Sequence, residues 1–214
     1  MIIRTGLLGG SFNPAHRGHK RASANAMRAL GLDEMWWLVS PGNPLKEKKG
    51  MASLAARFAS ARRQARRLPI RVTAIERELG SPFTVETLRV LIRRYPHRRF
   101  VWIMGADNLV QFHRWRQWRE IAALVPIAVV ARPGYDGPAQ AARAMGWLRR
   151  FVRPAASASR WTQWSMPALV ILKLPPDPTS ATGIRAGTPD WHNSSLYSFN
   201  PKALRDQVTR RPVT

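Results

Sequence analysis

Residues 7–20, LLGGSFNPAHRGHK, place two glycines, an Asn-Pro pair and two histidines directly behind a short apolar run. The run itself, IIRTGLLG, has the length and apolar character of a buried strand, and the helical pattern that begins at Arg17 stops at Leu30, before Gly31. Glycines at such a junction let a phosphate approach the backbone, because no Cβ stands in the way. A helix that starts directly behind them offers unpaired N–H groups and a positive dipole end to an anion. The stretch therefore predicts a strand–loop–helix unit that binds a phosphorylated ligand.

The rest of the chain alternates between strand-like and helical stretches. Apolar runs of strand length occur at MWWLVS, IRVTAIE, RFVWIMG, PIAVVAR and ALVILKL, and helical patterns occur at residues 52–68 and 84–95 and, interrupted, at 109–124. Such alternation indicates βαβ units and a parallel sheet that is covered on both faces. We therefore expect an α/β fold with a Rossmann-like, doubly wound parallel sheet. Ligands of such sheets bind outside the carboxyl ends of the strands, which is where the first strand meets Gly9 and Gly10.

The end of the chain departs from this alternation. Residues 146–167 mix Trp, Arg, Ser and Ala without a clear period, and we expect an excursion that packs on the domain. We predict one domain over residues 1–185. Residues 186–214 are predicted to form an extension that packs on the same domain or is partly flexible.

Composition limits the class of protein. With 45% hydrophobic residues and nine tryptophans among 214 residues, the chain has ample material for a core. The absence of cysteine excludes disulfides, thiolate metal sites and thiol nucleophiles, and it suits a reducing cytosol. No stretch has the length of a membrane span, and the N-terminus lacks the features of a signal peptide. We therefore expect a cytoplasmic protein with no membrane partner.

The charge is strongly positive. The chain holds 35 Lys plus Arg against 12 Asp plus Glu, a net charge of +23, and such an excess attracts polyanions at long range. Nucleic acids and phosphorylated metabolites are the two classes of partner that it favours. Most of the arginines fall in helical segments, as expected of solvated faces, and no zinc-finger spacing or RNA-binding aromatic signature accompanies them. We expect no specific nucleic acid partner, with a basic nucleic-acid-binding module as the alternative.

The two histidines at the start of the first helix, His16 and His19, are three residues apart and project from roughly one face. Two imidazoles in this place can donate hydrogen bonds to phosphoryl oxygens. Two alternatives remain: a metal site, although no third ligand lies nearby and zinc-binding pairs on helices are usually about four apart, and a structural role in capping the helix. The stretch contains neither G-x-x-x-x-G-K-[ST] nor G-x-G-x-x-G, so a P-loop or a dinucleotide-binding fingerprint is not supported.

A second helix opening lies near the end of the predicted domain. The stretch PPDPTSATGIR, residues 175–185, is Pro-rich and then begins a helix whose N-cap is either Thr179 or Ser180. Its N-terminus offers the same anion-binding geometry as the first helix.

The motif GGSFNPAHRGHK resembles the nucleotide-binding motif GG(S/T)FNPxHxGH of the nucleotidylyltransferase superfamily, and in this long form it resembles bacterial nicotinate-nucleotide adenylyltransferases. Further stretches are similar to that family: TSATGIR to its (I/L)SSTxIR signature, SPFTVETL to SYTxxTL, and MGADNLVQFHRW to its GAD segment with a following Trp. Thr179 and Ala181 depart from the second signature, and PGNPLK departs from a Pro-Pro-His-Lys/Arg loop. The resemblance spans residues 3–185, and the tail from Ala186 is unmatched.

The resemblance implies a single domain with the nucleotidylyltransferase type of Rossmann-like fold, and an enzyme of NAD biosynthesis. The 5'-phosphate of nicotinate mononucleotide would attack the α-phosphorus of ATP, giving nicotinate adenine dinucleotide and pyrophosphate. Mg²⁺ would bridge the triphosphate oxygens, held mainly by the substrate and water. A different acceptor, nicotinamide mononucleotide or phosphopantetheine, is the alternative. The sequence leaves open whether the protein is a monomer or a homo-oligomer.

The resemblance also implies the site residues. The residues that contact the ATP phosphates in catalysis are His16, His19 and Arg185. The other nucleotide-binding residues are Gly9, Gly10, Ser11, Phe12, Lys46, Gly105, Asp107, Ser180 and Thr182. The residues that bind the pyridine nucleotide are Thr84, Trp115 and Arg116. No residue is expected to ligate a metal directly.

Two of these residues have plain alternatives. Lys46, on the loop after the second strand, either moves onto the phosphates or is a solvated lysine beside Glu47. Asp107 resembles the acid on the ribose side, and it is also a candidate helix N-cap.

On the pyridine side, Trp115 matches the residue that stacks on the nicotinate ring, whereas Trp118 is expected in the core. The backbone N–H groups of Thr84 and Arg116 would meet the nicotinate carboxylate. Because a charged acceptor makes hydrogen bonds roughly twice as strong as a neutral one, this arrangement would favour the acid over the amide.

Overall fold

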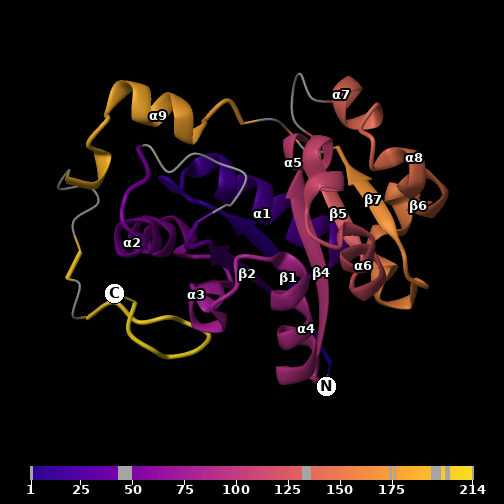
Figure 1. The fold of residues 1–214 in the computed structure, drawn as a ribbon, viewed down its shortest axis with the longest axis horizontal. Coiled ribbons are helices and arrows are strands. Elements are labelled where there is room, and N and C mark those ends of the chain that lie inside the picture. The colour runs from indigo at the N-terminus through magenta and orange to yellow at the C-terminus, as the bar shows by residue number, and fades with distance from the viewer. Residues whose placement is uncertain are drawn as a thin grey trace. The chain divides into compact units, whose positions relative to one another are not determined.

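The structure is a computed structural model that describes residues 2–42, 50–131, 136–173, 175, 177–193, 199–200 and 203–213. Lys46 and most of the PGNPLK loop lie outside these residues. Seven strands form one parallel sheet in the order β3-β2-β1-β4-β5-β7-β6 (Figure 1). Their bounds are Ile3–Gly10 (β1), Glu34–Val39 (β2), Ile70–Thr73 (β3), Arg98–Gly105 (β4), Ile127–Val130 (β5), Val152–Arg153 (β6) and Leu169–Leu172 (β7).

Helices alternate with these strands, which confirms the predicted α/β class. The α-helices are Arg17–Leu30 (α1), Leu54–Ala65 (α2), Ile75–Leu79 (α3), Thr84–Arg94 (α4), Ala106–Gln111 (α5), Trp118–Leu124 (α6), Asp136–Gln140 (α7), Met145–Leu148 (α8) and Ala181–Gly187 (α9). The 3-10 turns are Phe112–Arg114 (η1), Arg149–Phe151 (η2), Ala155–Gln163 (η3) and Trp191–Asn193 (η4).

Two differences from the expected elements have local causes. IRVTAIE was expected to be a strand throughout, but β3 ends at Thr73 and α3 begins at Ile75. The helix is terminated by Gly80 in the left-handed conformation (φ 64°), a C-cap that glycine adopts without a steric cost. The region expected as one broken helix, 109–124, contains α5, η1 and α6 in turn, and Gln117 (φ 50°) separates the last two.

The contacts divide the chain into two compact units. Unit 1 contains residues 1–8, 24–35 and 83–176, and unit 2 contains residues 9–23, 36–82 and 177–214.

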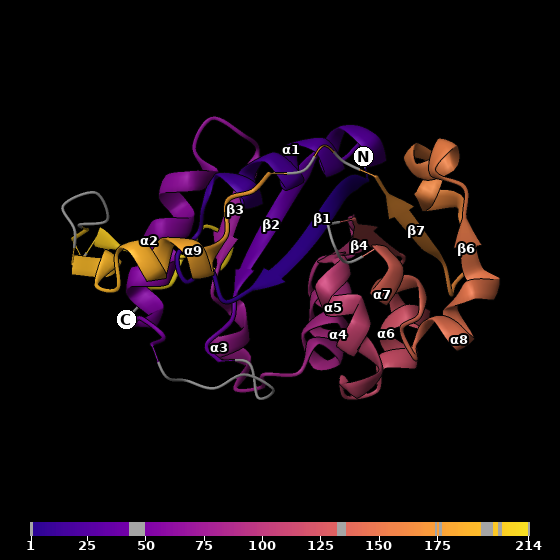
Figure 2. The ribbon, with the colours of Figure 1, turned by 90° about the horizontal axis from the view of Figure 1, so that it is seen from above.

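In unit 1, β4 is the central strand. It pairs in parallel with β1, where Leu8 lies opposite Ile103, and with β5, where Trp102 lies opposite Ile127. The segment from Phe100 to Met104 is buried throughout, as expected of a parallel strand covered on both faces. Helices α4, α5 and α6 lie on one side of β4 and β5 (Figures 1 and 2).

The excursion at residues 146–167 packs within unit 1. Its short strand β6 pairs with β7, with Val152 opposite Leu169. The Trp161 ring is 2% exposed, and its Nε1–H donates to the carbonyl of Leu30 at 2.9 Å. Trp147 lies edge-on to Trp118, with ring centroids 5.4 Å apart. Trp118 is thus packed in an aromatic cluster, although its own surface is only half-buried.

In unit 2, the described end of the chain is fixed along β3. Gln207 pairs with Val72 in both directions: its N–H donates to the Val72 carbonyl at 3.1 Å, and its Oε1 accepts from the Val72 N–H at 2.9 Å. The buried carboxylate of Asp206 accepts hydrogen bonds from four groups: Thr73 Oγ1, Ala74 N, Val208 N and Thr209 N. This segment covers a strand at the edge of the sheet, which would otherwise present unpaired backbone groups.

Candidate functional site

The first part of the site is the glycine loop, defined as residues 9–16, which starts with the last two residues of β1 and belongs to unit 2. Phe12 adopts a left-handed backbone conformation (φ 47°) that is rare for a residue with a bulky side chain. Its ring is 2% exposed and stacks against Trp37 with centroids 5.0 Å apart; on another side it contacts the His19 ring at 4.9 Å. The burial of Phe12 thus stabilises its unusual backbone conformation, and its ring packs against one face of His19.

The buried side chain of Arg57, on α2, fixes the backbone of the glycine loop and of the segments beside it. Arg57 is 1% exposed, and its guanidinium donates to the carbonyls of Ser11 (2.8 Å), Ser40 (2.7 Å) and Ala52 (3.0 Å). Burial lowers the pKa of Arg57 to about 10, so it remains a cation at neutral pH. One side chain therefore fixes three separate backbone segments around the glycine loop.

Glu76 on α3 contacts Ser40, one of the residues that Arg57 also binds. Its carboxyl is hydrogen-bonded to the Ser40 side chain, and burial raises its pKa to about 7. The backbone N–H of Ser40 in turn donates to the carbonyl of Gly10 at 3.0 Å. A titratable group is thus two hydrogen bonds away from the glycine loop.

Asn13 and Ser60 fix the rest of the loop. The Asn13 amide donates to the Gly50 carbonyl at 3.0 Å, and its oxygen accepts from the Ala52 N–H at 3.2 Å. The N–H of Ala15 donates to Ser60 Oγ at 3.1 Å. The Asn13–Pro14 peptide bond is cis. Side chains on both sides thus tie the glycine loop to α2 and the residues before it: Arg57 and Ser60 from α2, and Asn13 from the loop itself.

The two histidines lie against each other at the start of α1. Their ring centroids are 3.8 Å apart. His16 Nδ1 accepts from the Gly18 N–H at 3.1 Å, and His19 Nδ1 accepts from the His16 N–H at 3.2 Å. Because Nδ1 of each ring accepts, the neutral imidazoles carry their protons on Nε2. Both rings therefore carry an Nε2–H group, which is the kind of donor that binds a phosphoryl oxygen.

The same geometry modifies one expectation. We expected the first N–H groups of α1 to be available to an anion, but the Gly18 N–H is already bound by His16. His16 is 4% exposed, and its Nδ1 caps the start of the helix. The capping role that was considered as an alternative therefore applies to this nitrogen.

The second signature lies at α9, also in unit 2. Ser180 is the N-cap, and its hydroxyl accepts from the Gly183 N–H at 3.0 Å. Arg185 donates to the carbonyl of Asn13 at 2.6 Å and to the Thr182 hydroxyl at 3.4 Å. Arg185 thus joins this signature to the glycine loop, and Ser180, Thr182 and Arg185 lie on one short helix beside it.

Asp177, which lies in the segment before α9, links that segment to α1. Its carboxylate accepts from Arg17 (3.2 Å) and Arg21 (3.1 Å), and also from the Thr179 N–H (3.0 Å). The hydrogen bonds from Thr179, together with the two arginines, hold the pKa of Asp177 well below its usual range. A Cβ on Gly18 would lie 3.0 Å from the Thr179 carbonyl, so a glycine is needed where the two signatures meet.

Unit 1 holds the residues expected on the pyridine side. Trp115 is half-buried and packs edge-on against Phe112 (5.4 Å) and Trp102 (6.2 Å). The Arg116 guanidinium lies over the Phe83 ring at 4.7 Å, directly before Thr84. Thr84 is the first residue of α4, where backbone N–H groups have no acceptor within the helix. Thr84 is therefore brought close to the adjacent residues Trp115 and Arg116, although it lies far from them in the sequence.

The two remaining residues of unit 1 sit after β4. Gly105 is the N-cap of α5, and Asp107 lies in the first turn of that helix. The alternative role of Asp107 as the N-cap is therefore wrong, although its carboxylate is favourably placed near the helix N-terminus.

Sequence reasoning missed Arg57, Asn13 and Asp177 as supports of the site. Arg57 lies on the apolar face of α2 together with Phe58 and Ala61, which are fully buried. An arginine at a position that the helical period assigns to the core was the available signal.

The described residues contain no group of three or more His, Cys, Asp or Glu side chains that could hold a metal ion. In the same residues, no helix is long and apolar enough to cross a membrane. The zinc alternative for His16 and His19 therefore gains no support from the described part of the chain.

Comparison with known proteins gives the family. A family model described as Cytidylyltransferase-like matches residues 7–187. A probable nicotinate-nucleotide adenylyltransferase from Erythrobacter litoralis is 60% identical over 211 residues, covering 99% of this chain and 94% of that protein. One from Parvibaculum lavamentivorans is 50% identical over 183 residues, covering 86% and 91%.

The fold has solved counterparts. The structure of Plasmodium falciparum nicotinic acid mononucleotide adenylyltransferase complexed with NaAD has a TM-score of 0.59 at 12% identity, covering 86% of this chain and 83% of that chain. Because the sequence match to the relative from Erythrobacter extends over nearly all of both chains, the protein belongs to the nicotinate-nucleotide adenylyltransferase family of nucleotidyltransferases.

Proposed function

We propose that this enzyme transfers the adenylyl group of ATP to nicotinate mononucleotide, in NAD biosynthesis. The observation that carries the proposal is the grouping, within unit 2, of two Nε2–H donors with the arginine of the second signature beside one clamped loop. That set of donors suits a polyphosphate.

The reaction is a displacement at phosphorus. A phosphate oxygen of the mononucleotide forms a bond to the α-phosphorus of ATP, and the bond from that phosphorus to the bridging oxygen of pyrophosphate breaks. The protein supplies no nucleophile. Its contribution is to position the two substrates and to place donors where charge develops.

We assign these donors as follows. His16 and His19 direct Nε2–H toward oxygens of the ATP phosphates, and the backbone N–H groups near Ser11 and Phe12 bind the α-phosphate. Ser180, Thr182 and Arg185 hold the β- and γ-phosphates, and the leaving pyrophosphate stays in their reach. Gly9 and Gly10 let the triphosphate approach the backbone, and Gly105 and Asp107 lie on the ribose side. Lys46, outside the described residues, stays a prediction.

The pyridine end is bound by unit 1. Trp115 offers an aromatic face to the nicotinate ring, and the backbone N–H groups of Thr84 and Arg116 meet the carboxylate. The Arg116 guanidinium over Phe83 adds a nearby positive charge, partly offset by Glu86 at 3.8 Å. A carboxylate is favoured over an amide in this environment, because charge-assisted hydrogen bonds are the stronger ones.

From the family resemblance we propose that the reaction uses Mg²⁺, which would lower the charge on the triphosphate and hold its oxygens. The described residues offer no set of carboxylates for the ion, and Asp177 is occupied by arginines. We therefore propose that the ion is bound through ATP and water, and we assign it no protein ligand. A cytoplasmic location also stays a prediction.

The test is a pyrophosphate-release assay with ATP, Mg²⁺ and either nicotinate or nicotinamide mononucleotide. We expect release with the acid and at least about tenfold slower release with the amide. Equal rates would contradict the carboxylate assignment. No release with either would contradict the proposed acceptor, and phosphopantetheine would be tried next.

A further inference from the structure

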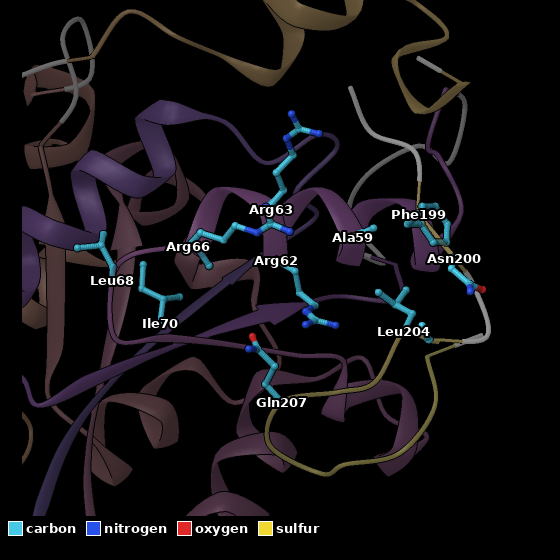
Figure 3. Close-up of a pocket in the computed structure, with 12 residues that line it drawn as sticks. Ala59, Arg62, Arg63, Arg66, Leu68, Ile70, Phe199, Asn200, Leu204 and Gln207 are labelled. Carbon is cyan, nitrogen blue, oxygen red and sulfur yellow. The ribbon is translucent and has the colours of Figure 1, made fainter. Parts of the chain in front are cut away.

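Unit 2 contains a cavity that the transfer reaction does not use. It has a volume of about 400 Å³ and lies between α2, the residues before β3, and the carboxyl-terminal segment (Figure 3). This size falls within the range of small-molecule sites. It lies along residues 59–66, from the middle of α2 to its C-cap Arg66. Arg57 and Ser60 of the same helix instead contact the glycine loop with their side chains.

One wall of the cavity is basic. Arg62, Arg63 and Arg66 line it, and its described lining includes no Asp or Glu. Arg62 and Arg66 are four residues apart, so their side chains share a face of α2 and repel each other. In Figure 3 the Arg62 side chain extends from α2 toward Gln207, and Arg63 points away from Gln207, at the rim. A bound anion would relieve this repulsion.

The apolar wall of the cavity, defined as Leu68, Ile70 and Leu204, is the smaller part of a mainly polar lining. Ile70 and Leu204 are each only 5% exposed, so Leu68 provides most of its accessible surface. Gln207 adds an amide whose backbone and oxygen are fixed on Val72. A single phosphate ion would leave most of this space and all of the apolar wall unused. A ligand that fits both walls carries an anionic group at one end and a flat apolar ring at the other.

Charge alone does not distinguish this place, since exposed arginines occur over much of the chain. Arg149, Arg150 and Arg153, for example, are exposed and line no described cavity. What differs at α2 is the combination of a cation pair, a half-open cavity and an apolar contribution to its lining. Arginine is also the side chain that binds phosphate through two parallel hydrogen bonds.

We propose that this cavity is a second nucleotide site, which binds a nucleoside monophosphate. Its phosphate lies on Arg62 and Arg66, and its base lies against Leu68, Ile70 and Leu204. The site is separate from the residues assigned to adenylyl transfer and does not depend on that assignment.

The test is calorimetric titration of the full chain with AMP. The protein is first saturated with nicotinate adenine dinucleotide, the product of the proposed transfer, so that the transfer site is filled without adding a free mononucleotide. We expect one further binding event in the wild type. In the double variant Arg62→Ser/Arg66→Ser this event should weaken at least about tenfold. Pyrophosphate release by this variant should stay within about twofold of wild type, because both residues are exposed and outside the transfer machinery.

A matched control separates local contacts from net charge. The double variant Arg93→Ser/Arg143→Ser removes the same two charges at exposed positions of unit 1 and should bind AMP as the wild type does. Equal weakening in both variants, or no further binding event in the wild type, would overturn the proposal. Titration with inorganic phosphate is the last arm: affinity equal to that of AMP would overturn the role given to the apolar wall.

Discussion

The two signatures of unit 2 are anchored in very different ways. In the glycine loop, Phe12, Asn13 and His16 are 2%, 5% and 4% exposed, and the buried Arg57 fixes the backbone around them. Helix α9, by contrast, contains no buried residue. It is joined to its surroundings by polar contacts, chiefly Asp177 with Arg17 and Arg21, and Arg185 with the Asn13 carbonyl.

This difference in anchoring suits two different tasks, stabilising charge in the chemical step and binding the ATP phosphates. A loop built into the core holds its donors in place before the substrate arrives, as stabilisation of developing charge requires. A helix held by charged contacts at the surface can adjust to the phosphates at little cost, because such contacts are individually weak. We therefore expect changes in the glycine loop to affect the chemical step or folding, and changes around α9 to affect ATP affinity.

The largest effect is expected at His19, which lies against Phe12 in the glycine-loop cluster. His19→Ala should lower kcat by about 10² to 10³, the range for loss of one preorganised donor. Steady-state pyrophosphate release measures it, with circular dichroism as the control for folding. A rate close to wild type would remove His19 from the mechanism and would leave the loop with a structural role only.

Arg57 tests whether the loop depends on its buried support. Arg57→Met keeps most of the side-chain volume but leaves the carbonyls of Ser11, Ser40 and Ala52 without their donor, and we expect a loss of about 2–3 kcal/mol in the free energy of unfolding. Urea denaturation gives this value. Arg62→Met, on the exposed part of the same helix, is the matched control and should change stability by less than about 0.5 kcal/mol. Similar values for the two variants would contradict the clamp.

Because Glu76 titrates near neutral pH, the stability that it contributes beside the glycine loop depends on pH. Its pKa is raised to about 7 in the folded protein from 4.5, so between these values the folded state keeps a proton that the unfolded state has lost. The contribution of Glu76 to stability is therefore complete below about pH 4.5 and falls as the pH rises toward 7, by roughly 1 kcal/mol per pH unit. Glu76→Gln should lack this decline when unfolding is measured from pH 5 to 8. Parallel pH profiles of the two proteins would show that Glu76 does not titrate in this range.

The smallest effect is expected for the contacts that hold α9. Asp177→Asn weakens the link to Arg17 and Arg21, and the KM for ATP should rise by about fivefold or less while kcat stays nearly unchanged. Initial rates at varied ATP concentration separate the two constants. Arg28→Gln, at the other end of α1, serves as the control and should leave both constants as they are. A fall in kcat at constant KM would mean that α9 acts on the chemical step after all.

Local patterns were sufficient for much of the fold. The helix predicted from Arg17 to Leu30 has the bounds of α1, and Ser180 is the N-cap of α9, because a helical period and a capping hydroxyl act over a few residues. The short helix α3 was missed, since five residues show no period, although Gly80 marked its end. The excursion at 146–167 gave no period because it is made of short turns and a two-residue strand.

The alternation of strands and helices, the two signatures and the spacing of the histidines could be read from the residues alone, because all are properties of neighbouring residues. Three features became visible only in the folded chain: Arg57 is a buried clamp, Asp206 and Gln207 fix the end of the chain along β3, and Arg62 and Arg66 line one cavity with Leu68. Each of these contacts either joins residues far apart in the chain or depends on burial by such residues. Their free energy comes from burial and from polar groups that pair only after the chain has folded, so no local pattern records them.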